Sequence, residues 1–313
     1  MTDLSDAAHQ LLQRQIHTWK LLADNLATLA GMETRDFDFG GFIVKTQFNP
    51  QRLYSVSAKT DEHSVRNRKC FLCDENRPPE QESLSCGNGY KILCNPYPIF
   101  PEHFTIVHEQ HQPQRIEPSF AAMLQVCEML GSRYTIFYNG PQCGASAPDH
   151  LHFQASNRGA TPLDREYDRI KRRIARKDDV EIFAGENYLR PLWGIESQNR
   201  SAIEQAFSRI LKNFGELAPN PIEPLVNVFC SREDQTHRAV VFPRTAHRPG
   251  SYYADDPAQR LSFSPGAADM AGIVVMPVEQ QFRRTVKDDL ARMYREVCPD
   301  AQMFERITRE FLR

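Results

Sequence analysis

A run of six residues near the middle of the chain, Asp-His-Leu-His-Phe-Gln, alternates polar and apolar side chains after its aspartate. Successive side chains of a β-strand point to opposite faces, so this alternation predicts a strand over 150–156. On that strand His150, His152 and Gln154 share one face, and the leucine and phenylalanine between them face the core. Three polar groups on one strand face need a reason to be there, which favours a functional site. The alternative interpretation is a pair of structural histidines.

A glycine-containing loop, Pro-Gln-Cys-Gly-Ala-Ser-Ala-Pro-Asp, leads into this strand. Its residues Gly144, Ala145 and Ser146 can offer backbone N–H groups to phosphate oxygens. A neutral imidazole is a competent nucleophile at phosphorus and a good leaving group from the phosphoramidate that it forms, so it can divide one transfer into two steps. Loop and strand together therefore predict a phosphate site with a nucleophilic histidine.

Hydrophobic periodicity predicts a similar order of elements in the two parts of the chain. Behind a leading helix that spans 11–29, the first part is predicted to have strands over 39–48, 90–98, 103–109, 134–140 and 150–156 and a helix over 119–130. A basic helix is predicted over 165–177, and the second part is predicted to have helices over 201–213 and 280–297 and strands over 224–231, 237–244 and 271–279. This pattern predicts an α+β protein with an internal duplication, divided into 1–197 and 198–313, whose second half has lost the histidines.

Composition excludes several classes of partner. The chain of 313 residues carries 38 Lys and Arg against 40 Asp and Glu, which argues against nucleic-acid binding by bulk charge. No apolar run approaches the roughly 18–20 residues that a membrane span needs. Eight cysteines in a chain of this length do not form a disulfide pattern, so we expect a reducing, cytoplasmic location with thiols free or metal-bound.

The pair Cys70-Phe-Leu-Cys73 has the spacing of two thiolates on one tetrahedral zinc ion. The same spacing occurs in redox proteins, but there the motif opens a helix, and the residues that follow Cys73 are a poor helix start. A third interpretation is that both cysteines are small buried residues. His108 and His111 are candidates for the remaining ligands.

The segment Tyr-Asn-Gly-Pro-Gln-Cys-Gly-Ala-Ser-Ala-Pro-Asp-His-Leu-His-Phe-Gln resembles the active-site segment of the HIT superfamily branch with a His-x-His-x-Gln motif. That branch contains galactose-1-phosphate uridylyltransferases, diadenosine tetraphosphate phosphorylases and GDP-hexose phosphorylases. The resemblance implies that His152 is the nucleophile, that Gln154 contacts the phosphate and that Ser146 lies near the phosphates. It also implies two HIT-like halves with antiparallel sheets and packed helices, the second half degenerate.

The same resemblance implies a set of zinc ligands and nucleotide contacts. Many uridylyltransferases bind a structural zinc through a Cys-x-x-Cys pair, a Pro-x-His and the first motif histidine. In this chain those positions are Cys70, Cys73, His103 and His150. The family pattern further implies that Asn95 binds the ribose or base and that Phe71 and Leu72 pack against the base. Asn95 is equally consistent with a turn residue.

The predicted function is a two-step nucleotidyl transfer. The substrate is a nucleoside diphosphate sugar or a dinucleoside polyphosphate, and the acceptor is phosphate or a sugar phosphate. Basic side chains that can neutralise these phosphates are Lys59, Arg238, Arg244 and Arg248, and the alternative for each of them is a surface salt bridge. The alternatives are a HIT-type hydrolase and a non-enzymatic, zinc-stabilised nucleotide-binding protein. No nucleic acid or membrane partner is expected, and the oligomeric state is left open between monomer and homodimer.

Overall fold

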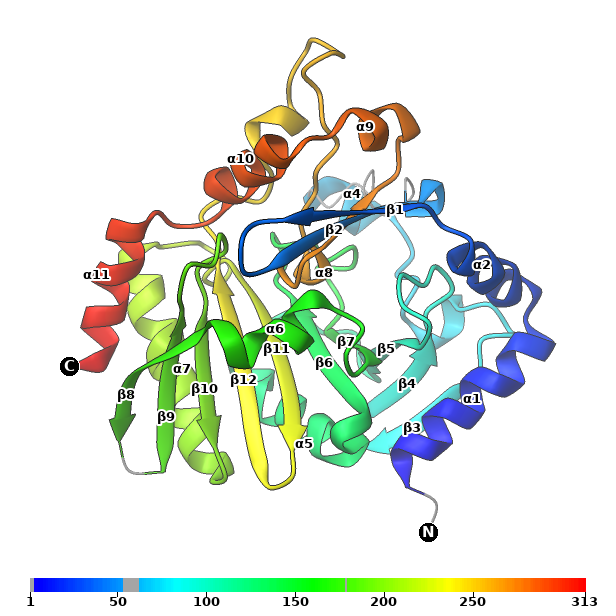
Figure 1. Ribbon diagram of the computed structural model, residues 1–313. Coiled ribbons are helices and arrows are strands. Elements are labelled where there is room, and N and C mark those ends of the chain that lie inside the picture. The colour runs from blue at the N-terminus through cyan, green and yellow to red at the C-terminus, as the bar shows by residue number, and fades with distance from the viewer. Residues whose placement is uncertain (1–2, 53–61, 178) are drawn as a thin grey trace.

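The computed structural model describes residues 3–52, 62–177 and 179–313. Its largest element is a ten-stranded sheet in which every neighbouring pair is antiparallel (Figure 1). In spatial order its strands are β3 (Ser83–Gly87), β4 (Tyr90–Cys94), β5 (His103–His108), β7 (His152–Asn157), β6 (Tyr134–Asn139), β11 (Val226–Glu233), β12 (Thr236–Pro243), β10 (Trp193–Ser197), β9 (Val180–Gly185) and β8 (Lys171–Lys177). No helix within the described ranges is long and apolar enough to span a membrane.

The order of strands confirms that the chain contains two halves of the same topology. From the outer edge inward, the first half runs β3-β4-β5-β7-β6 and the second runs β8-β9-β10-β12-β11. In each half one helix follows the third strand along the chain. This helix is α5 (Phe120–Leu130), between β5 and β6, in the first half and α7 (Arg200–Leu217), between β10 and β11, in the second. The halves meet where β6 pairs with β11, so a single sheet continues across both (Figure 1). The second group of five strands begins at Lys171, and the division at residue 197 stays a prediction.

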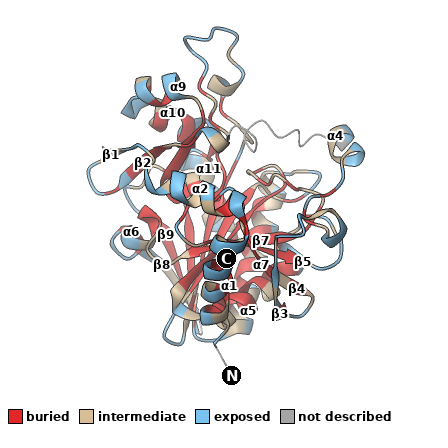
Figure 2. Cartoon of the chain, turned by 90° about the vertical axis from the view of Figure 1, so that its right-hand side faces the viewer, coloured by how far each residue is buried: buried red, intermediate tan, exposed pale blue. Residues whose placement is uncertain are grey.

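Helices cover one face of the large sheet. α1 (Leu4–Thr18), α2 (Lys20–Ala30), α5, α7 and α11 (Ala301–Leu312) contribute apolar side chains to one core together with the sheet. Figure 2 shows this distribution: the strands are largely buried, and the outward faces of the helices are exposed. This face carries Phe153, the apolar neighbour of the two motif histidines.

A second core lies on the opposite face of the sheet. It is covered by a three-stranded sheet in the order β1 (Thr34–Asp38), β2 (Ile43–Phe48) and β13 (Ile273–Met276), in which β2 and β13 are parallel. Four helices complete this cover: α6 (Pro162–Ile170), α8 (Ala267–Met270), α9 (Glu279–Arg284) and α10 (Lys287–Val297). A short helix, α4 (Glu62–Asn67), precedes the Cys-x-x-Cys pair, and 3₁₀ turns occur at Pro50–Arg52, Asp74–Asn76, Glu117–Ser119, Gly131–Arg133 and Gly250–Tyr252.

The prediction of one helix over 165–177 is wrong in its second part. The helix α6 ends at Ile170, and Lys171–Lys177 forms the edge strand β8, paired with β9 through an irregular register. Its arginines and lysines are mostly exposed, and charged side chains of this kind protect an edge strand from pairing with another chain. The leading helix also divides at Trp19, and the helix predicted over 280–297 divides at Thr285 and Val286.

The sheet brings the polar residues of the first half onto one surface. β7 lies between β5 and β6, with Val107 opposite His152 on one side and Phe137 opposite Gln154 on the other. Residues directly opposite one another on neighbouring strands share a face. The polar face of β7 therefore looks toward the same side as Phe137, which belongs to the second core.

Candidate active site and metal centre

His152 is the first residue of β7 and is almost fully buried. Its Nδ1 atom lies 2.8 Å from the carbonyl oxygen of His150. A carbonyl oxygen only accepts hydrogen bonds, so Nδ1 carries the ring proton and donates it. The lone pair is then on Nε2, the atom that can attack an electrophile.

The charge state of this ring follows from its surroundings. Burial lowers the pKa of His152 to about 4, and the bond to the carbonyl of His150 opposes that shift only in part. The ring is therefore neutral at neutral pH. Tautomer and charge together leave Nε2 with an available lone pair.

Gln154, two residues further along β7, is oriented by His103. The backbone N–H of Ile99 donates to Nδ1 of His103 at 3.2 Å, so the ring proton of His103 is on Nε2. That Nε2 lies 2.7 Å from Oε1 of Gln154, which accepts the hydrogen bond. Burial lowers the pKa of His103 to about 3, so this arrangement persists at neutral pH. With its oxygen engaged, Gln154 has its amide N–H₂ group available as a donor.

The loop between β6 and β7 is held by the second half of the molecule. Gly144 adopts φ +98°, and a Cβ there would lie 2.5 Å from Cα of Gly266, so only glycine fits. The side chain of Asn139 accepts hydrogen bonds from the backbone of Ala267 at 2.7 Å and from Asn227 at 3.1 Å. Asn227 also donates to the carbonyl of Cys143 at 2.7 Å. These contacts fix the part of the loop that follows β6.

Ala145 and Ser146 follow in this loop beside β7. Ala145 is buried and its N–H donates to the carbonyl of Gly140 at 3.4 Å, while Ser146 is half-buried. Together with Gly144 they remain candidates for phosphate contact.

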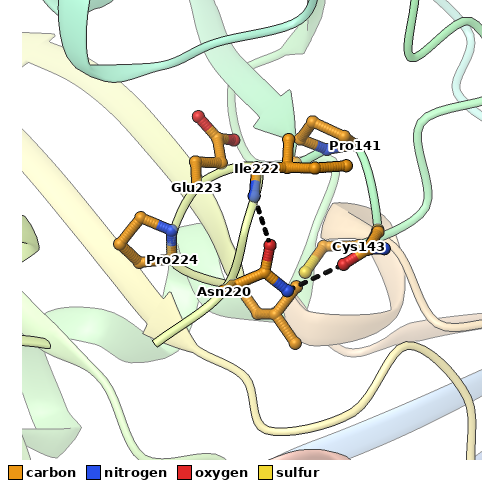
Figure 3. Close-up of a pocket in the computed structure, with 9 residues that line it drawn as sticks. Pro141, Cys143, Asn220, Ile222, Glu223 and Pro224 are labelled. Carbon is orange, nitrogen blue, oxygen red and sulfur yellow. Dashed lines mark hydrogen bonds between the residues drawn. The ribbon is translucent and has the colours of Figure 1, made fainter. Parts of the chain in front are cut away.

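The segment 220–225 supports the start of the same loop, and the two segments line a common pocket (Figure 3). Asn220 donates to Oε1 of Gln142 at 2.8 Å. Glu223 accepts from the hydroxyl of Tyr138 at 2.7 Å and from the N–H of Ile116 at 2.8 Å. Burial raises the pKa of Glu223, and these two donors partly counter the shift. We interpret this pocket as a structural junction.

A cluster of four side chains beside the histidine strand could hold a metal ion. Sγ of Cys70, Sγ of Cys73, Nδ1 of His150 and a ring nitrogen of His111 all lie within 4.8 Å of one another. Nδ1 of His150 is 3.2 Å from Cys70 Sγ and 3.5 Å from Cys73 Sγ, and Nδ1 of His111 is 3.3 Å from Cys73 Sγ. Tetrahedral zinc ligands at normal bond lengths are about 3.3–3.8 Å apart. The donor set and its spacing therefore fit zinc.

The second nitrogens of the two imidazoles support this assignment. Nε2 of His150 donates to the carbonyl of His108 at 2.7 Å, which leaves Nδ1 as a lone-pair donor toward the thiols. Nε2 of His111 is 3.7 Å from Oδ2 of Asp149. Asp149 is paired in turn with Arg68 at 2.5 Å. A carboxylate near the outer nitrogen of a ligand histidine is a common arrangement in metal sites.

The prediction that His103 completes this cluster is wrong. His103 and His111 lie at opposite ends of β5. His103 is the first residue of the strand, and His111 lies three residues beyond its last. The first and last residues of this six-residue strand are five steps apart, which is about 16 Å. His103 instead contacts Gln154, and His111, one of the two rival candidates, supplies the fourth ligand position.

The predicted base contacts occupy two different environments. Leu72 is buried with Leu93 and Val107 in a small apolar cluster, and Phe71 is 47% exposed with the guanidinium of Arg68 over its ring. Asn95 accepts a hydrogen bond from Tyr97 N–H at 3.0 Å, as in an Asx turn. Their contact with a nucleotide remains a prediction.

Two of the four basic residues suggested as phosphate partners, Arg244 and Arg238, have structural roles. Arg244 is fully buried and donates to four backbone carbonyls and to Oδ1 of Asn227. Arg238 is paired with Glu196 on the second half of the sheet. Lys59 lies outside the described residues.

One residue of this site, Gln114, carries no recognisable signal in the sequence. The side chain of Gln114 is fully buried and hydrogen-bonds to the backbone of His152. It belongs to no recognisable motif. Its role follows only from the path of the loop after β5.

Comparison with known proteins supports the assignment that the motif suggested. A family model described as "Domain of unknown function (DUF4922)" matches residues 11–157. Galactose-1-phosphate uridylyltransferase from Staphylococcus saprophyticus is 22% identical over 250 residues, which cover 75% of this chain and 48% of that protein. Diadenosine 5',5'''-P1,P4-tetraphosphate phosphorylase 2 from Saccharomyces cerevisiae is 36% identical over 86 residues, which cover 23% of this chain and 26% of that protein. The sequence matches thus span at most about half the length of these relatives.

The fold shows a similarity over nearly the whole chain. The crystal structure of yeast Ap4A phosphorylase Apa2 superposes with a TM-score of 0.62 at 15% sequence identity, and the match covers 92% of this chain and 97% of that chain. The predicted α+β class with antiparallel sheets and packed helices is therefore confirmed. In sequence the chain is thus similar to a uridylyltransferase and to a dinucleoside tetraphosphate phosphorylase, and in fold it is similar to Apa2.

Proposed function

We propose that this protein is a nucleotidyltransferase that carries a nucleoside monophosphate covalently on His152. The observation that carries the proposal is the state of the ring: Nδ1 donates to the carbonyl of His150, and burial keeps the ring neutral. Both leave Nε2 as a nucleophile on a strand whose pairing limits its motion. The names of the sequence relatives, a uridylyltransferase and a dinucleoside tetraphosphate phosphorylase, agree with this chemistry.

The reaction balances as two displacements at the α-phosphorus. In the first, the Nε2 lone pair of His152 forms a P–N bond, and the P–O bond to the leaving sugar phosphate or nucleotide breaks with its electron pair. In the second, an oxygen of the acceptor attacks phosphorus and the P–N electrons return to Nε2. The ring is positively charged in the intermediate, and the carbonyl oxygen of His150 stabilises it through the Nδ1–H bond.

The other polar residues act on the phosphoryl oxygens. Gln154, its oxygen engaged by His103, donates from its amide N–H₂ to a non-bridging oxygen. Backbone N–H groups of Gly144 and Ser146 are the proposed donors on the loop side. A glutamine cannot act as a base toward water, which favours transfer over hydrolysis.

Zinc is the proposed metal, and its proposed role is structural. Cys70, Cys73, His111 and His150 would hold it, and four protein ligands leave no open position for substrate. When bound, the ion ties the Cys-x-x-Cys segment to the first histidine of the motif. It thereby stabilises the chain segment that leads into His152.

The test of the proposal is a half-reaction without acceptor. The protein is incubated with single nucleoside diphosphate sugars and dinucleoside polyphosphates, and the released sugar phosphate or nucleotide is quantified. A covalent carrier releases about one equivalent per chain and then stops until phosphate or a sugar phosphate is added. Continuous release without acceptor supports the hydrolase alternative, and binding without release supports the binding-protein alternative.

The pH dependence of the first half-reaction is a further prediction. Protonated imidazole cannot attack phosphorus, so the rate falls as pH falls through the pKa of His152, which is about 4. We expect release from a nucleoside diphosphate sugar at pH 5.5 to stay within about twofold of its rate at pH 7.5. A falling limb centred near pH 6.5 in folded protein would contradict this account.

The same pKa shifts also affect stability, which the pH experiment must control. Unfolded histidines bind protons below about pH 6.5, whereas His152 and His103 stay neutral down to about 4 and about 3. The unfolded chain therefore binds more protons in this window, and the free energy of unfolding falls as pH decreases. Circular dichroism at each pH separates loss of fold from loss of the nucleophile.

A further inference from the structure

A single glutamine side chain connects the backbones of β6 and β7 beside the nucleophile. Gln114 lies in the loop after β5 and is fully buried. Its Nε2 donates to the carbonyl of Asn139 at 3.0 Å and to the carbonyl of His152 at 3.0 Å. Its Oε1 accepts from the N–H of His152 at 2.8 Å. Both backbone polar groups of His152 are therefore bonded to one side chain.

The register of the sheet explains why this contact exists. β6 and β7 are paired from Tyr134 opposite Asn157 to Phe137 opposite Gln154, and the pairing stops there. Continued by two residues, the ladder would place Asn139 opposite His152. The amide of Gln114 occupies this interval instead, with the same donor and acceptor types as a peptide group. It takes the place of a strand neighbour for His152.

The position of Gln114 is fixed by contacts of its own loop. Its backbone N–H donates to the carbonyl of Pro148 at 3.1 Å, and the N–H of Leu151 donates to the carbonyl of Gln112 at 2.7 Å. The N–H of Ile116 is held by Glu223. The loop is thus anchored on both sides of Gln114.

We propose that Gln114 is a positioning residue for His152, an inference that rests on the nucleotidyl-transfer function proposed above. By separating the ends of β6 and β7, its side chain lets the loop that carries Gly144 leave the sheet beside the nucleophile. By hydrogen-bonding to the N–H and the carbonyl of His152, it fixes the backbone of that residue and so the position of its ring Nε2. A shift of about 1 Å in a reacting group can cost about 100-fold in rate.

A purely structural glutamine would behave differently, and the chain offers a matched control. Gln15 is also fully buried, and it donates to the carbonyl of Glu80, away from the motif. Gln15→Met and Gln114→Met each replace a buried amide by an apolar chain of similar size. Both are expected to lower thermal stability, but only Gln114→Met should slow chemistry.

The experiment measures the rate of adduct formation and the affinity for nucleotide in the wild type and both variants, at a temperature where all are folded. We expect Gln114→Met to form the nucleotidyl adduct about 100-fold more slowly with nearly unchanged affinity, and Gln15→Met to match the wild type. Hydrogen exchange at the His152 amide, which does not depend on activity, should be faster in Gln114→Met and unchanged in Gln15→Met. A Gln114→Met rate within about threefold of the wild type with unchanged exchange overturns the proposal.

A second variant keeps the test decisive if Gln114→Met does not fold. Gln114→Glu retains an acceptor for the His152 N–H and loses the donors to both carbonyls, so slow adduct formation is expected again and a wild-type rate overturns the proposal. Failure of the proposed function is recognised separately, because the wild type and Gln15→Met would then form no adduct. That outcome would overturn both the nucleotidyl-transfer function and the positioning role of Gln114.

Discussion

The variant His152→Ala is expected to lose nucleotidyl transfer by several orders of magnitude while it retains its fold and its affinity for nucleotide. The loss follows because no other described group shares the position of Nε2 at the start of β7. The fold is expected to survive because the ring is on the polar face, whereas Leu151 and Phe153 pack into the core on the other. The measurement is the single-turnover rate together with nucleotide binding by calorimetry.

A chemical complementation experiment sharpens this prediction. In His152→Gly, free imidazole can enter the vacated space and carry the nucleotide in place of the side chain. We expect added imidazole to restore part of the release of sugar phosphate, and His152→Ala, with less space, to be restored less. Transfer near the wild-type rate in His152→Ala would contradict the covalent mechanism.

The second large effect concerns the metal centre. Loss of one ligand from a closed site removes much of the folding free energy that the ion contributes. His111→Ala and Cys70→Ser are therefore expected to lose bound zinc and to unfold about 10 °C lower than the wild type. The measurements are metal content by elemental analysis of freshly purified protein and the midpoint of thermal unfolding.

His103→Ala is the matched control for this prediction. Its ring contacts Gln154 and lies away from the two cysteines, so this variant is expected to keep about one zinc per chain and to slow transfer. Zinc retained in His111→Ala and lost in His103→Ala would overturn the ligand set that we assign. Wild-type protein without metal would remove the zinc proposal and leave nucleotidyl transfer untouched.

The sequence predicted those parts of the fold in which local pattern and tertiary environment agree. The alternation around His152 predicted β7 to within two residues at its start, because one face of that strand is polar and the other lies in the core. The helix α5 and the strands β11 and β12 also follow their predicted positions closely. By contrast, Lys171–Lys177 carries charges along an exposed edge, where no apolar alternation distinguishes a strand from a helix.

The candidate functional residues divide in the same way. The motif resemblance indicated His152, Gln154 and the Cys-x-x-Cys pair, since these positions have fixed spacing within short segments. The fourth member of the Cys and His cluster was not predictable, because His103 and His111 lie eight positions apart on one segment and only the path of the chain beyond β5 decides between them. Gln114 had no signal at all, since its function depends on where two strands separate.

A nucleotide bound covalently to His152 would be seen directly in the mass of the intact protein. Wild-type protein is mixed with a nucleoside diphosphate sugar or a dinucleoside polyphosphate in the absence of acceptor. The reaction is quenched without acid, and the mass of the intact protein is measured by mass spectrometry. We expect a gain of one nucleoside monophosphate, located on His152 by peptide mapping, and its loss when acceptor is added. Turnover of the same substrate with no trappable adduct on His152 would contradict a covalent mechanism.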